Sequence, residues 1–162
     1  LSLVGARINQ HGPLGQQQLL LLVLATVIVG LATVAGIQAF DQGKSQAAND
    51  ALTQRAVSIA SDIQAQANKP SQLGGLPKPG NSNYGSSDDN PGATEVANSI
   101  GFESETGISA EGAGEGGECK IKIDDSEPAV QCAGGNAESS VTATVTGLAS
   151  DSLATSFGTG TV

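Results

Sequence analysis

Residues 19–40 form an apolar run without a single charge, and no proline interrupts the chain between this run and Pro70. At about 1.5 Å per residue, a helix over the run is long enough to cross a bilayer core of roughly 30 Å. The sequence beyond the run continues to favour a helix as far as Lys69. These features predict one long helix over residues 16–69, whose first half requires lipid or a protein core around it.

The second half of this predicted helix is amphipathic. Its apolar residues recur at three- and four-residue spacings, which places them on one helical face: Ala48, Leu52, Ala56, Ile59, Ile63 and Ala67. Pro70 ends the helix, because the residue before a proline is disfavoured in the helical region. We therefore expect this face to cover a small sheet or to pack with other helices.

The rest of the chain has the composition of a linker followed by a β domain. Residues 70–101 are rich in Pro, Gly, Ser and Asn and predict an irregular linker. Within 102–162, alternating segments predict short strands, at 120–123, 129–132, 140–145 and 153–157. No helical pattern lies between them, so hairpin connections and an antiparallel sheet are expected. The predicted fold class is α+β.

Cys119 and Cys132 are the only cysteines, and they flank the predicted hairpin 120–131. The hairpin would bring them together across its open end. We predict a disulfide between them, because an exported domain is in an oxidising compartment. On the chain-entropy model, closing a loop of this length stabilises the fold by roughly 3 kcal/mol.

Composition argues against several classes of function. The net charge is −9, and no basic stripe is present, so we predict no nucleic-acid partner. The single histidine, His11, precedes the apolar run, so no His-based triad can form in the C-terminal part. Acidic pairs such as Glu103 and Glu105 are expected to form a solvated face. We predict no catalytic residue, cofactor or metal site, and no enzyme.

Three interpretations of the apolar run compete: a cleaved signal peptide, a membrane anchor, and a helix that leaves the membrane to pack against copies of itself. Arg7 before the run favours an N-terminus inside and a C-terminal part outside. Small residues within the run favour the third interpretation, because they let helix backbones approach closely. The residues predicted to pack in such a core are Leu19, Leu22, Ala25, Val29, Gly30, Ala32, Gly36 and Phe40.

This layout resembles the type IV pilins and the archaeal-type pilins. Those proteins have a leader that ends in Gly, an apolar helix just after it, an amphipathic extension and a small C-terminal β domain. Residues 1–15 correspond to such a leader, and Gly15–Gln16 corresponds to the processing junction. Leu20 stands where bacterial type IV pilins usually carry Glu, and the Gln-led junction is closer to the archaeal type.

The resemblance implies a structural subunit of an extracellular filament. Its partners would be identical subunits, the cytoplasmic membrane before assembly, a prepilin peptidase and the pilus assembly machinery. Its location would be the cell surface, and adhesion would be one role among several. Two alternatives stay open, a minor or pseudopilin-like subunit of a secretion apparatus and a single-pass membrane-anchored surface protein.

Overall fold

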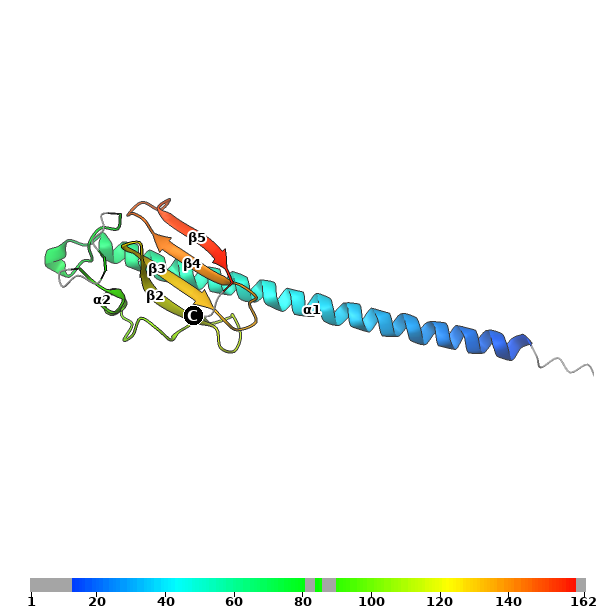
Figure 1. Ribbon diagram of the computed structural model, residues 1–162. Helices are drawn as coiled ribbons and strands as arrows, with labels where there is room; N and C mark the ends of the chain where they lie inside the picture. The colour runs from blue at the N-terminus through cyan, green and yellow to red at the C-terminus, as the bar shows by residue number, and fades with distance from the viewer. Residues whose placement is uncertain (1–12, 81–83, 86–89, 160–162) are drawn as a thin grey trace, which may run out of the picture. The chain divides into compact units, whose positions relative to one another are not determined.

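The computed structural model describes residues 13–80, 84–85 and 90–159. The helix α1 (Pro13–Ala67) is followed by the 3-10 turn η1 (Ser71–Leu73) and the short helix α2 (Ala93–Ser99). Five strands come next (Figure 1): β1 (Ile108–Ser109), β2 (Glu118–Asp124), β3 (Glu127–Ala133), β4 (Ser140–Val145) and β5 (Leu153–Gly158). The predicted α+β fold class is confirmed.

The chain divides into two compact units, Leu1–Gln42 and Gly43–Val162. In its described part, the first unit consists of the apolar half of α1. The second unit contains the remainder of α1, both short helices and all five strands. The hydrophobic core of the described residues lies entirely within this second unit.

The strands form one antiparallel sheet in the order β1-β2-β3-β4-β5, so each strand pairs with its neighbour in sequence. The four predicted strands appear at the expected places, with ends that differ by a few residues. The edge strand β1 was not predicted, because a segment of two residues is too short to show an alternating pattern. Hairpin connections suffice for this topology, as expected from the absence of helices between strands.

The core is built mainly from one face of α1 and one face of the sheet, with further residues from α2 and the loops. All six residues of the predicted amphipathic face of α1 are buried, together with Ala60. All of them except Ala48 belong to one cluster with the inward-facing residues of three strands, Cys119 and Ile121 on β2, Val130 and Cys132 on β3, and Val141, Ala143 and Val145 on β4. The alanines let the helix approach the sheet closely, and β-branched side chains fill the remaining space. The core is therefore small in volume, as the scarcity of aromatic residues predicts.

Two parts of the segment 70–101 are helical, η1 and α2. In α2, the carboxylate of Glu95 accepts a hydrogen bond from the backbone N–H of Gly92, which caps the first turn. The side-chain amide of Gln66 on α1 donates to the carbonyl of Ser99 at the other end of α2, at 2.6 Å. The prediction of a wholly irregular linker is thus wrong, because tertiary contacts stabilise a helix too short for its periodicity to be seen.

The turn between β2 and β3 places two non-glycine residues in the left-handed region. Asp125 has φ 49° and Ser126 has φ 66°. Consecutive positive φ angles in a two-residue loop define a type I′ turn, which matches the twist of a hairpin and favours Asn-Gly or Asp-Gly. Asp125 tolerates this conformation, whereas the side chain of Ser126 crowds its own backbone.

We expect the substitution Ser126→Gly to stabilise the protein by about 0.5–1 kcal/mol, since relief of left-handed strain exceeds the entropy that glycine loses on folding. Urea denaturation of the full chain in detergent measures the change. The matched control is Ser150→Gly, at an exposed turn residue whose φ is not positive, where no gain is expected. A Ser126→Gly variant no more stable than this control would contradict the strain argument.

Candidate functional site

The largest exposed apolar feature among the described residues is the first half of α1. Its Leu, Val, Ile and Phe side chains are each at least half exposed, from 51% for Val23 to 72% for Leu20. This part of α1 is the one helix among the described residues that is long and apolar enough to cross a membrane, with a mean hydropathy of 2.7 and none of its most apolar window buried. Soluble monomers rarely expose so large a contiguous apolar surface.

The residues predicted to pack in a filament core all lie on this exposed stretch. Leu19, Leu22, Val29 and Phe40 are 62–66% exposed, and Ala25, Gly30, Ala32 and Gly36 are exposed as well. None of them is a member of the hydrophobic core of the second unit. Their packing against other chains therefore stays a prediction.

Two hydroxyl groups in the apolar stretch are satisfied within the helix. The Thr26 hydroxyl donates to the carbonyl of Val23, and the Thr33 hydroxyl donates to the carbonyl of Gly30, each at 2.8 Å. A hydroxyl left without a partner costs free energy in lipid or in a protein core, and these local bonds remove that cost. The stretch is thus compatible with either apolar environment.

Glycines 30 and 36 have no role that the chain itself explains. A Cβ atom added at either position would meet no atom within 4 Å outside the local helix. Glycine in a helix interior costs about 1 kcal/mol relative to alanine. Nothing inside the chain compensates for this cost, so the argument for close approach at Gly30 and Gly36 depends on a neighbouring molecule.

The predicted processing junction lies at the beginning of α1. The helix starts at Pro13, a residue suited to the first helical position because its missing N–H needs no partner there. Gly15 and Gln16 follow within the first turn, and Gln16 is exposed. Residues 1–12 of the leader-like segment lie outside the described residues, and cleavage at the junction stays a prediction.

The predicted disulfide is confirmed. Cys119 on β2 lies directly opposite Cys132 on β3 in the ladder, and their sulfur atoms are bonded. Both side chains are fully buried on the inner face of the sheet. The bond closes the open end of the hairpin, far along the strands from the Asp125–Ser126 turn. It therefore reinforces the sheet where the hairpin would otherwise separate first.

The β domain carries two open depressions. One, of about 560 Å³, is lined by the glycine-rich loop 107–118, with Glu111 and Glu118. The other, of about 440 Å³, is bordered by Arg55, whose guanidinium lies over the ring of Phe102 and donates to the carbonyl of Ser109. Among the residues that the structure describes, no three His, Cys, Asp or Glu side chains are grouped to hold a metal ion.

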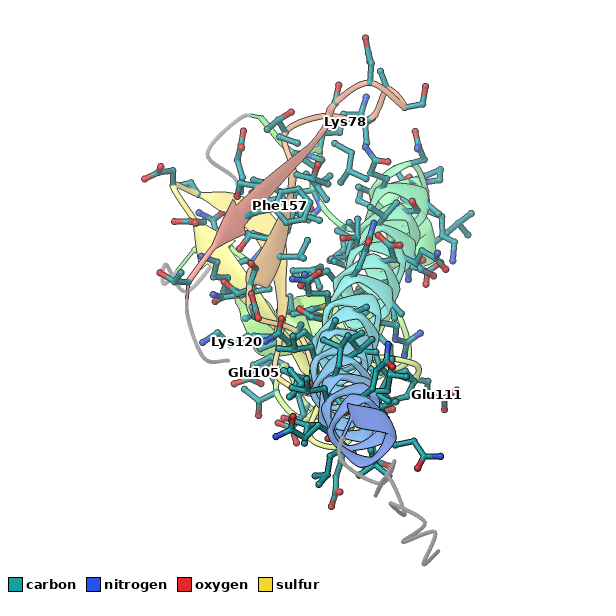
Figure 2. All side chains as sticks on the ribbon, turned by 90° about the vertical axis from the view of Figure 1, so that its right-hand side faces the viewer. Lys78, Glu105, Glu111, Lys120 and Phe157 are labelled. Carbon is teal, nitrogen blue, oxygen red and sulfur yellow. A yellow bond between two sulfur atoms is a disulfide. The ribbon has the colours of Figure 1, made fainter. Side chains whose placement is uncertain are left out.

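Glu103 and Glu105, the two acidic residues considered for acid–base chemistry, have different surroundings (Figure 2 labels Glu105). Glu103 is exposed. Glu105 accepts hydrogen bonds from its own backbone N–H and from the Thr94 hydroxyl, and these bonds lower the pKa of its carboxyl. The Glu105 bond to Thr94 links the loop before β1 to α2. This is a structural role for Glu105.

Tyr84 is the largest fully buried side chain and the only tyrosine. Its hydroxyl donates to the carbonyl of Pro77. Burial disfavours the charged phenolate and raises the pKa of Tyr84 to about 12. The burial of Tyr84 was not predicted, because an isolated Tyr in a loop has no periodic pattern to mark it as core.

No protein family model matches this chain, and neither the curated proteins nor the solved structures contain a significant match to it.

The folded protein should bind the Tyr84 proton more tightly than the unfolded chain, whose tyrosine has a pKa of about 10. The unfolded state loses this proton first, so stability should fall as pH rises from about 10 through the folded pKa of about 12. Ultraviolet absorbance of tyrosinate, together with denaturation at each pH, measures both effects without interference, since the chain has no Trp. Tyr84→Phe is the control that should lose this pH dependence. A native protein whose Tyr84 titrates near the ordinary value would contradict the assigned burial.

Proposed function

We propose that this chain is a structural subunit of an extracellular, type IV pilus-like filament, held together by its apolar N-terminal helices. The observation that carries the proposal is the exposed apolar surface of α1 over residues 19–40, none of which belongs to the buried core of the second unit. A chain whose first half-helix exposes so much apolar surface needs a second environment for that stretch. Before assembly the environment would be the membrane, and afterwards it would be identical helices.

The free energy of the two steps differs. Burial of apolar surface from water is worth about 25 cal/mol per Å², so removing the stretch from water is strongly favourable in either environment. Transfer from lipid to a filament core gains much less, because lipid tails are already apolar. Filament formation would then depend on close packing of helices and on assembly machinery. Gly30 and Gly36 would permit that close packing.

The β domain would form the outer surface of such a filament. Its disulfide is suited to an oxidising exterior. Its acidic residues suit a soluble surface, and Lys122 forms an ion pair with Asp124 at 2.9 Å. An excess of surface charge of one sign favours solubility.

Shearing cells that express the chain and imaging the supernatant by electron microscopy tests the proposal. We expect filaments whose protein is this chain. Short rods that remain with a secretion apparatus would favour the minor-subunit alternative. Protein that stays entirely in the membrane fraction would contradict the filament and favour a membrane-anchored surface protein.

Substituting Gly30→Leu or Gly36→Leu should abolish filaments while leaving membrane insertion intact, because the added side chain meets nothing within its own chain but would block close approach of a neighbouring helix. The matched control is Val34→Leu, which adds one methylene at an already large exposed residue and should still assemble. Filament yield by microscopy and membrane content by fractionation are the two readouts. Normal filaments from both glycine variants would refute the packing account.

A further inference from the structure

The strand β5 forms one edge of the sheet and is almost fully exposed. From Ala154 to Gly158 every residue is exposed, and the Phe157 side chain is 65% exposed on the edge (Figure 2). The strand contains no charged residue and no proline. Natural proteins usually protect long edge strands with charges, prolines or bulges, and β5 has none of these.

The hydrogen bonds to β4 show which backbone groups of β5 face outward. The carbonyl of Ser152 accepts from the N–H of Thr146, and the carbonyl of Gly158 accepts from the Ser140 hydroxyl, so even-numbered residues direct their backbone groups toward β4. These directions alternate along a strand. The N–H and C=O groups of Leu153, Thr155 and Phe157 therefore face the open edge.

We propose that β5 pairs with β5 of a second copy of this chain, antiparallel and centred on Thr155. In this register Thr155 lies opposite Thr155 of the second copy, and Leu153 lies opposite Phe157. All three residues with outward backbone groups are then paired, which no other register achieves within Leu153–Gly158. The exposed Phe157 side chain is then covered by the half-buried Leu153 of the other copy, and this contact occurs twice, once on each side of the symmetry axis.

The composition of β5 identifies a second copy as the partner. Direct pairing of a strand with itself places like charges opposite one another whenever the strand is charged, and β5 avoids this. The opposite edge of the sheet, β1, has two residues, so pairing of β5 with β1 of another copy would form fewer hydrogen bonds. Aromatic–aliphatic pairs such as Phe157 with Leu153 are favourable across strands.

This contact is two-fold symmetric, so it joins two copies and does not propagate. It uses none of the α1 residues on which the proposed filament depends. Subunits in two different filaments, or two subunits in a membrane, could form it equally. Its success or failure is therefore independent of the proposed function.

Cysteine cross-linking of the full chain in detergent tests the register. Both native cysteines are in the intramolecular disulfide, so Thr155→Cys introduces the sole free thiol. In a hydrogen-bonded antiparallel pair the Cα atoms are about 5.5 Å apart, within the range that a disulfide can bridge. The matched control is Ser156→Cys on the same exposed strand, which would lie about 7–8 Å from its symmetry mate, diagonally across the pair.

We expect Thr155→Cys to form a covalent dimer on mild oxidation, with a yield at least several-fold above that of Ser156→Cys. A mixture of Leu153→Cys and Phe157→Cys chains should give the mixed dimer in preference to either homodimer, which provides a second reading that does not require the Thr155 variant. Thr155→Lys should abolish the noncovalent dimer in native mass spectrometry. Equal cross-linking at positions 155 and 156, or no dimer from either experiment, would overturn the proposal.

Discussion

The structure depends on an imbalance between two apolar surfaces. One face of α1 between Ala48 and Ala67 is buried by the sheet of its own chain, whereas the stretch between Leu19 and Phe40 is exposed on every side. No rearrangement of side chains can hide the second surface, because a helix that is apolar all round needs neighbours all round. The environment of this stretch therefore comes from outside the chain, and the fold of the rest must succeed without it.

The β domain folds without the apolar stretch, using a simple topology and a small core. Its strands follow one another as a meander, so the ladder contacts close short loops and cost little entropy. Its core consists mainly of Ala, Val, Ile and Leu around a single Tyr, and small cores of this kind commonly need further support. The buried disulfide between β2 and β3 supplies part of it. Side-chain bonds from Gln64 to the loop after β4 and from Gln66 to α2 attach the helix to the domain.

Much of this arrangement could be predicted because period and spacing determine it. The three- and four-residue spacing of Leu52, Ile59 and Ile63 identified the buried face of α1, and the cysteine positions identified the disulfide. The helix α2 and the burial of Tyr84 could not be predicted, since both depend on tertiary contacts between segments distant in sequence. The direction of the backbone groups of β5 follows only from the hydrogen bonds between β4 and β5, which the sequence does not show. No periodicity distinguishes Thr155 from Ser156 in that respect.

The central claim is that the apolar stretch of α1 packs against the same stretch of other subunits in the assembled state. Cryo-electron microscopy of purified, detergent-free material tests it most directly, because side chains around residues 19–40 can be assigned to particular copies. The account predicts a helical polymer in which Leu22, Val29 and Gly36 contact α1 of neighbouring subunits. A detergent-free particle that contains a single chain, with this stretch covered by its own β domain, would contradict it.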